Sequence, residues 1–327
     1  MPSGIRLAGA VVALSLAMLH GTANATPVLA SLGAAAGYGA FVFGDFTSSS
    51  SDTQTNLAVG GNANLSNYAV GQSTSPGTSA KLVVGGNLSG QNGSVGPGGA
   101  GAIYVGGSNS SSLTAATKSQ NLPSSQLPID FAAAKSQYQS LSQTLFNTAA
   151  TGSVVNQYGT LTLTGTASDV NYFTVQASDW NSANTVNINV AKNSTIVINI
   201  LGTSVVFQNG QISINGTSGE NNAANALTLY NLYQATSLSL PGSKAPQGSV
   251  LAPFASVTGG YGQLNGQLIA QSFSGNTQFN RPDFAGAVTT AVPVPGTLPL
   301  LASGLVLLGW LAWSGRRQGH AAAVARA

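Results

Sequence analysis

The feature that most constrains this fold is a short segment that occurs three times in the first third of the chain. Each copy is an apolar run followed by two glycines and a small polar residue. The copies are Leu57–Asn62, Leu82–Asn87 and Ile103–Ser108. Their starts lie 25 and then 21 residues apart, within the range of periods found in stacked repeats. The pattern predicts one strand and one Gly-Gly turn in each repeat, joined by loops over residues 72–79 and 89–101.

The second half alternates apolar and polar residues with a period of two, as half-buried strands do. The apolar positions are Leu161 and Leu163, Val186, Ile188 and Val190, Ile196, Ile198 and Ile200, and Ile212 and Ile214. Strand starts near residues 186, 196, 205 and 212 place three strands in about 26 residues, close to the upstream repeat. We therefore predict a mainly β fold, a right-handed parallel β-helix (solenoid). The strand spacing also allows an antiparallel sandwich.

One segment, residues 128–150, breaks the β pattern. Its apolar residues recur at spacings of three and four, which places them on one stripe of an α-helix. They are Phe131, Ala134, Tyr138, Leu141 and Leu145. Asp130 stands at the positive N-terminal end, and Gly152 is placed to end the helix. We expect one amphipathic helix packed alongside a sheet.

Charged residues make up only 5% of the 327 residues, where a soluble domain carries about a quarter. Residues 26–291 contain six basic and seven acidic residues. The basic residues are scattered singly, at Lys81, Lys118, Lys135, Lys192, Lys244 and Arg281. Nucleic acid is not expected as a partner, because it requires clustered cations.

The chain has no cysteine, and its two histidines, His20 and His320, lie in the terminal segments. The body therefore lacks the residues for Ser-His-Asp or Cys-His catalysis and for thiolate or imidazole metal sites. Asp45 with Asp52, and Asp169 with Asp179, are the acidic pairs close in sequence. We interpret them as turn or capping residues and expect no enzyme and no cofactor. A calcium site using Asp45 and Asp52 is left open.

The N-terminus reads as a secretory signal peptide over residues 1–25. Arg6 precedes an apolar run, and Ala23 and Ala25 form an A-x-A cleavage site before Thr26. We expect the chain to be exported, with the body, residues 26–290, outside the inner membrane.

The C-terminal segment, residues 291–327, has three parts. Val292, Pro293, Val294 and Pro295 form a proline motif, residues 297–315 are long and apolar enough to span a bilayer, and Arg316 and Arg317 follow as a cytoplasmic stop. This layout resembles the PEP-CTERM sorting signal of Gram-negative bacteria, with Val294 in place of the usual Glu. The resemblance implies processing by an exosortase and release to the cell surface or the medium. Permanent anchoring through the transmembrane helix is the alternative.

The body also resembles the choice-of-anchor A family over about residues 32–284. The similarity is carried by Phe41–Phe46, by Asp52-Thr53, by Leu57–Tyr68, by Ile129–Phe131 at the start of the helix, and by Gly248–Pro253 with Asn265–Ala270. The resemblance implies an adhesive, collagen-binding-like β-helix domain and supplies no catalytic residues.

The leading hypothesis is a non-enzymatic surface or matrix adhesin that binds exopolysaccharide through repeated Asn, Thr, Ser and Gln side chains. Five rings are candidates for stacking on sugars: Tyr172, Trp180, Tyr230, Tyr233 and Tyr261. Each is more commonly a packing residue than a ligand platform. An ice- or lattice-binding solenoid is the alternative, for which Thr160, Thr162 and Thr164 form the one visible threonine row. A polysaccharide lyase or hydrolase is disfavoured because the acids do not cluster.

Overall fold

The computed structural model describes residues 28–29, 32–75, 80–208, 210–242 and 245–288. The predicted signal peptide with its cleavage site and the whole C-terminal sorting segment lie outside these residues. Within the described part of the chain, no helix is long and apolar enough to cross a membrane. The membrane span expected at residues 297–315 is therefore outside the structure.

The molecule is mainly β, with one large parallel sheet and one long helix. The principal ladder of the sheet, called the helix face, runs in the spatial order β10 (Thr117–Ser119), β9 (Ala102–Val105), β6 (Ala80–Val84), β4 (Asn56–Val59), β2 (Tyr38–Val42), β21 (Leu268–Asn280), β20 (Ser249–Asn265), β18 (Thr228–Asn231), β15 (Thr195–Leu201) and β13 (Val170–Gln176). Every neighbouring pair in this ladder is parallel.

Further strands continue the same levels around the stack. A second set of strands comprises β3 (Phe46–Thr53), β5 (Ala63–Val70), β7 (Leu88–Gln91), β8 (Ser94–Val95), β16 (Ser204–Val206) and β19 (Ser237–Leu240). A four-stranded sheet has the order β11 (Ser153–Gln157), β12 (Thr160–Thr164), β14 (Thr185–Asn189) and β17 (Gln211–Ile214). Short elements complete the chain: β1 (Val28–Leu29) paired with β22 (Ala287–Val288), the helix α2 (Ala177–Ser182), and the 3-10 helices η1 (Gly33–Ala35), η2 (Pro97–Gly99), η3 (Ser124–Gln126) and η4 (Ala223–Leu227).

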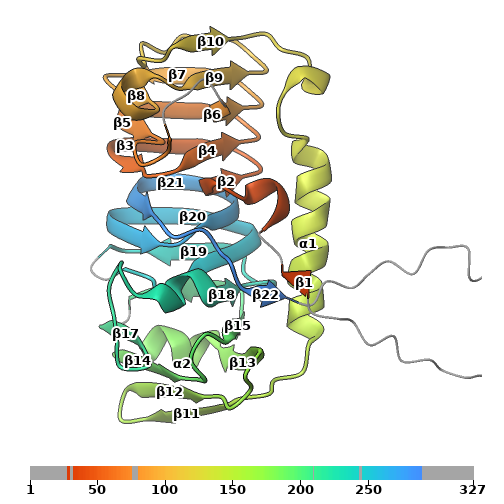
Figure 1. Ribbon diagram of the computed structural model, residues 1–327, viewed down its shortest axis with the longest axis vertical. Helices are drawn as coiled ribbons and strands as arrows, with labels where there is room; N and C mark the ends of the chain where they lie inside the picture. The colour runs from red at the N-terminus through yellow and green to blue at the C-terminus, as the bar shows by residue number, and fades with distance from the viewer. Residues whose placement is uncertain (1–27, 30–31, 76–79, 209, 243–244, 289–327) are drawn as a thin grey trace, which may run out of the picture.

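The chain builds the ladder as two stacks that meet in the middle. The N-terminal stack, residues 38–119, rises from β2 to β10. The long helix α1 (Phe131–Asn147) then returns alongside it (Figure 1), and the C-terminal stack, residues 153–280, rises from β11 to β21. Strand β21 pairs with β2 at Leu268 and Ala40, which joins the two stacks. Nothing in the sequence pattern had indicated this junction.

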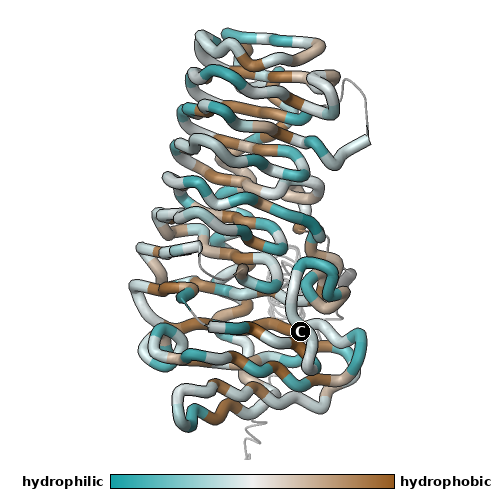
Figure 2. The backbone as a smooth tube through the Cα atoms, turned by 90° about the vertical axis from the view of Figure 1, so that its left-hand side faces the viewer, coloured by the Kyte–Doolittle hydropathy of each residue, from teal (hydrophilic) through white to brown (hydrophobic). Residues whose placement is uncertain are grey.

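The predicted repeat is confirmed by the strand register. Leu57 pairs with Leu82 and Leu82 with Ile103, so the 25- and 21-residue spacings each correspond to one level. In the other half, Thr185 pairs with Gln211, which matches the expected repeat of about 26 residues. Figure 2 shows hydrophobic segments recurring at similar places from level to level. The antiparallel sandwich is wrong, since antiparallel pairing between named strands of the described residues is confined to β1–β22 and β11–β12.

The Gly-Gly turns allow successive levels to stack at one corner. A Cβ on Gly85 would lie 2.3 Å from the carbonyl oxygen of Gly60, and one on Gly106 would lie 2.3 Å from that of Gly85. Only glycine permits this approach of backbone to backbone. The following side chains form an asparagine ladder: Asp45 Oδ1 accepts from the Asn62 amide at 2.7 Å, Asn62 Oδ1 from Asn87 and Asn87 Oδ1 from Ser108, both at 2.9 Å.

Helix α1 is confirmed, with one correction. Asp130 caps it, accepting a hydrogen bond from the Ala133 amide at 2.9 Å. The predicted stripe faces the sheet: Ala134, Tyr138 and Leu145 are buried and pack with outward residues of the helix face. The prediction that Gly152 ends the helix is wrong. The helix ends at Asn147 with Thr148 as its C-cap, and Gly152 lies five residues further along.

Two details of the strand predictions are also wrong. The segment 89–101 is not all loop, because it contains most of β7 and all of β8. Strand β15 was expected to be half-buried, but its side chains from Thr195 to Ile200 are all buried. The reason is that one face of β15 lines the interior while the other lies under α1, and a strand covered on both faces shows no apolar–polar alternation.

Candidate functional site

The candidate site is a polar surface, called here the hydroxyl face. It is formed by β16, β19, β7 and the segments 46–49 of β3, 63–66 of β5, 256–259 of β20 and 272–275 of β21. Side chains alternate along each segment, so one set points into the core and the next points to solvent. Phe46, Val257 and Phe273 belong to the buried set.

The outward side chains align in rows that cross the two stacks. The longest row contains Ser239, Thr258, Ser274, Thr47, Asn64 and Ser89, each paired in register with the next. Four of the six are exposed and the two at the ends are partly exposed. Residues from opposite ends of the chain thus form one continuous line of hydroxyl and amide groups.

Two shorter rows flank the long one. Ser204, Ser237, Ser256 and Ser272 form the second row, and Ser49, Ser66 and Gln91 form the third. None of the strand segments of the hydroxyl face contains a charged residue. Thr47, Ser49, Asn64, Ser66 and Ser274 also line a depression of about 260 Å³ where the rows are closest to the junction.

The geometry of parallel strands fixes the spacing of these groups. Neighbouring strands lie about 4.8 Å apart, and alternate residues along a strand are about 6.6 Å apart. The face is therefore a regular array of uncharged donors and acceptors on a rigid sheet. Such an array can bind a ligand that carries many hydroxyl groups at regular intervals, because each hydroxyl both donates and accepts hydrogen bonds.

An aromatic corner adjoins the hydroxyl face. Tyr261 is 74% exposed and lines a hollow of about 480 Å³ together with Asp52, Gln263, Asn276 and Gln278. Gln278 Nε2 donates to Asp52 Oδ1 at 3.2 Å. Partial burial raises the pKa of the Asp52 carboxyl, and the hydrogen bond from Gln278 opposes that shift. An exposed ring beside amides and a carboxylate is a combination that can stack on a ring and bind its hydroxyl groups.

The structure separates both acidic pairs. Asp45 directly precedes β3 and belongs to the asparagine ladder. Asp52 lies near the other end of β3 and belongs to the aromatic corner. Asp169 precedes β13 and Asp179 lies in α2 beyond its other end, accepting a hydrogen bond from Asn156 at 2.9 Å. Among the described residues no group of three His, Cys, Asp or Glu side chains could hold a metal ion.

The five candidate rings have different locations. Trp180 and Tyr230 are fully buried in the core, and Tyr172 is 6% exposed. Tyr233 packs against Phe146 and Phe254. Tyr261 is the candidate that presents its ring to solvent.

Thr160, Thr162 and Thr164 lie on β12, and the neighbouring strands do not extend them as threonine rows. These residues continue across β14 and β17 as mixed rows, Thr160–Thr185–Gln211 and Thr162–Asn187–Ser213. The larger array on the hydroxyl face was missed because its members come from segments more than 200 residues apart. The sequence signal that could have indicated the array is the alternation of Ser and Thr with buried residues at positions 46–49 and 256–258.

The sequence profile of a family described as "Putative Ice-binding-like adhesive domain" matches residues 31–281. The chain belongs to this family. The match covers both stacks, α1 and every strand of the hydroxyl face. Membership in the ice-binding-like adhesive family implies a non-catalytic role and a location at the cell surface or outside the cell. Comparison of the chain with curated proteins and with solved structures found no match.

Proposed function

We propose that this adhesive domain binds a hydroxyl-rich polymer, an exopolysaccharide of the cell surface or matrix, through the hydroxyl face, with Tyr261 stacking on a sugar ring at its edge. The observation that carries the proposal is the long row of outward Ser, Thr and Asn side chains in register across β19, β20, β21, β3, β5 and β7. An uncharged array on a rigid sheet suits a neutral, repetitive ligand. The proposal takes the fold to be a right-handed β-solenoid, in which the hydroxyl face is one side and faces the polymer.

The proposal is tested by co-sedimentation of the purified full chain with insoluble exopolysaccharide and with neutral glucans. Thr47→Arg places a long side chain in the centre of the long row and should weaken binding by roughly tenfold or more, because it lifts the polymer off the neighbouring hydroxyls. Thr164→Arg is the matched control, since Thr164 is also an exposed strand threonine but lies on β12. Equal loss in both variants, or loss in Thr164→Arg alone, would overturn the proposal.

Tyr261→Ala tests the aromatic corner separately. Loss of one stacking contact should weaken binding by roughly three- to tenfold, in line with about 0.5–1.5 kcal/mol for aromatic contacts. Unchanged affinity would remove Tyr261 from the site and leave the hydroxyl face as the binding surface.

Ice or another ordered lattice is a second candidate ligand, favoured by the in-register rows themselves. The rows mix Ser, Thr and Asn, whose polar atoms reach different heights above the sheet, and this favours a flexible polymer over a crystal plane. A thermal-hysteresis measurement decides between them. Growth inhibition of ice by wild type that is lost in Thr47→Arg would replace the polysaccharide proposal.

We further propose that the terminal segments deliver the domain to its place of action. The signal peptide ending at Ala25, the motif Val292–Pro295 and the Arg316-Arg317 pair support export, sorting by an exosortase and a transient inner-membrane intermediate. Mass spectrometry of the protein from its native cells tests this. A mature chain that begins at Thr26 and ends near Pro295 supports processing, whereas a chain that retains residues 297–327 supports permanent anchoring.

A further inference from the structure

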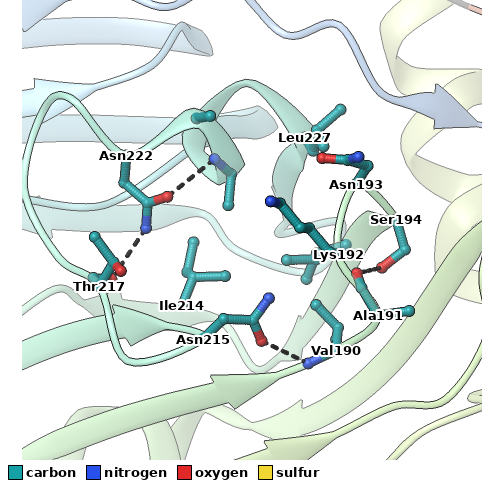
Figure 3. A pocket seen from close by; sticks show the side chains of 13 residues that line it. Val190, Ala191, Lys192, Asn193, Ser194, Ile214, Asn215, Thr217, Asn222 and Leu227 are labelled. Carbon is teal, nitrogen blue, oxygen red and sulfur yellow. Dashed lines mark hydrogen bonds between the residues drawn. The ribbon is translucent and has the colours of Figure 1, made fainter.

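A third hollow lies in the C-terminal stack, away from the strands of the hydroxyl face. It is a pocket of about 380 Å³ between the turn that joins β14 to β15, the end of β17 and η4. We call it the lysine pocket because Lys192 extends into it (Figure 3). Its volume lies within the range of about 300–1,000 Å³ typical of small-ligand sites.

Hydrogen bonds hold the walls of the lysine pocket in place. Ser194 Oγ donates to the Ala191 carbonyl at 2.7 Å and fixes the turn that carries Lys192. On the opposite wall, Asn222 Oδ1 accepts from the Ala224 amide at 3.1 Å and its Nδ2 donates to the Thr217 carbonyl at 3.0 Å. A pocket whose walls are fixed before binding loses little entropy when a ligand enters.

Two donors converge on the centre of the pocket. Asn215 Oδ1 accepts from the Val190 amide at 2.9 Å, which turns its Nδ2 toward the pocket and toward the Lys192 side chain (Figure 3). No hydrogen bond between described residues uses this Nδ2 or the Lys192 ammonium. The side chains that line the pocket include no Asp or Glu among the described residues. An ammonium and an amide N–H that point into one space without an acid favour an anionic ligand.

The remainder of the lining indicates what the anion is attached to. Val190, Ala224 and Leu227, which are partly exposed, provide an apolar surface beside the donors. The C–H face of a sugar ring can pack on such a surface while a carboxylate on the ring reaches Lys192 and Asn215. The neighbouring hollow differs, because its lining includes both Glu220 and Arg281, so an acidic group accompanies the basic one.

We infer that the lysine pocket binds the carboxylate of an acidic sugar unit, a uronic acid of the matrix polymer, with Lys192 and Asn215 as its two anchors. The inference rests on the proposed function for the polymer and adds a second site for its acidic units. The domain then binds neutral segments at the hydroxyl face and acidic units at the lysine pocket.

The test is calorimetric titration of the purified full chain, in mild detergent, with a galacturonic acid tetrasaccharide and with the same oligosaccharide after reduction of its carboxyl groups. Wild type should bind the acidic form at least tenfold more tightly, with an affinity that decreases with added salt. Lys192→Gln should reduce that affinity by roughly tenfold or more, as expected for a hydrogen bond to a charged group, and should remove the salt dependence. Lys118→Gln, at the exposed edge strand β10, is the matched control and should bind as wild type does.

Asn215→Asp sharpens the test. It preserves the acceptor for the Val190 amide and tolerates the left-handed backbone at this position, where φ is 50°, but it replaces the N–H donor with a negative charge. Binding of the acidic tetrasaccharide should be lost while the melting temperature stays within a few degrees of wild type.

Equal affinity for the acidic and reduced oligosaccharides would overturn the inference, and so would an unchanged affinity in Lys192→Gln. Equally tight, Lys192-dependent binding of a poly-aspartate peptide would also overturn it, because the pocket would then accept carboxylates without a sugar. Binding of the neutral polymer distinguishes the two proposals, because it should depend on Thr47 and be unchanged in Lys192→Gln. If the neutral polymer binds but the acidic tetrasaccharide does not, the inference fails and the proposed function remains.

Discussion

The two stacks form their corners in different ways. In the N-terminal stack the chain turns at Gly-Gly pairs, and exposed side chains of the asparagine ladder bind successive levels. In the C-terminal stack the spacing between paired residues varies, from 32 between Ile196 and Thr228 to 15 between Asn265 and Asn280. There the interior is filled by the rings of Trp180, Phe207 and Tyr230, whose centroids lie 5.1–5.5 Å apart. The N-terminal levels therefore repeat one Gly-Gly corner, whereas the spacing of the C-terminal levels varies around buried rings.

The largest difference between the stacks should appear on substitution of a corner glycine. Gly85→Val should destabilise the protein by about 3 kcal/mol or more, because its Cβ would meet the Gly60 carbonyl and two stacked backbones cannot move apart locally. Gly216 of the C-terminal stack is the control, since a Cβ there has nothing within 4 Å and φ is 77°. Gly216→Asn should cost less than about 1 kcal/mol. Denaturant unfolding monitored by circular dichroism measures both, and similar costs would contradict the distinction.

The next largest effect should be at the buried amides that attach α1 to the C-terminal stack. Asn231 Nδ2 donates to Asn199 Oδ1 at 2.7 Å and to the Ser142 carbonyl at 2.9 Å, and its Oδ1 accepts from Ser142 Oγ at 2.5 Å. Asn231→Ala leaves these groups buried without partners and should cost about 2–4 kcal/mol. Urea unfolding gives the value. A cost below about 1 kcal/mol would show that the helix is held by its apolar stripe alone.

An alkaline-pH effect should follow from Tyr138, in the middle of α1. Its hydroxyl donates to the Leu32 carbonyl and accepts from the Ala35 amide, and burial raises the pKa of this phenol to about 12. A phenol in the unfolded chain ionises near pH 10, so the unfolded state loses its proton first. The contribution of Tyr138 is complete below pH 10 and is lost as the pH rises to 12, by about 2 kcal/mol in total.

Unfolding curves between pH 9 and pH 12 check this effect. Tyr138→Phe should make the decrease in stability with pH shallower. Burial also raises the pKa values of Tyr230 and Tyr68, so part of the decrease should remain in the variant. Identical slopes in wild type and variant would contradict the assignment.

The smallest effect is expected from the exposed asparagine ladder. Asn87→Ala removes the acceptor for the Ser108 amide, but water can replace it, so the cost should be about 0.5–1.5 kcal/mol. Thermal unfolding is sufficient to measure it. A cost as large as that of Asn231→Ala would mean that the ladder, and not the glycine contact, holds the N-terminal levels together.

The contrast between the stacks also explains what could be predicted from the sequence. Leu57, Leu82 and Ile103 revealed one level each because the glycine corners repeat in the sequence itself. Strand β15 appeared half-buried because the contribution of α1 to its burial is not encoded locally. The end of α1 was misplaced because Thr148, not a glycine, caps it.

The candidate site was less predictable than the fold. Thr47 and Ser274 become neighbours through the β21–β3 register, which no local pattern specifies. The lysine pocket likewise combines Lys192 with Asn215, and each appears in the sequence as an ordinary loop residue. Tyr261 was among five equivalent rings until the packing of the other four was known.

The junction between β2 and β21 determines the order in which the molecule can be completed. During synthesis the N-terminal stack is made first, and the edges of β2 and β3 then present unpaired N–H and C=O groups until residues 268–280 exist. The last long strand of the chain thus fills a gap in the middle of the molecule instead of extending one end. A chain truncated before residue 268 would keep an open edge at its centre, and that edge can recruit a second copy. Completion of the native ladder and protection from self-association are therefore the same late event.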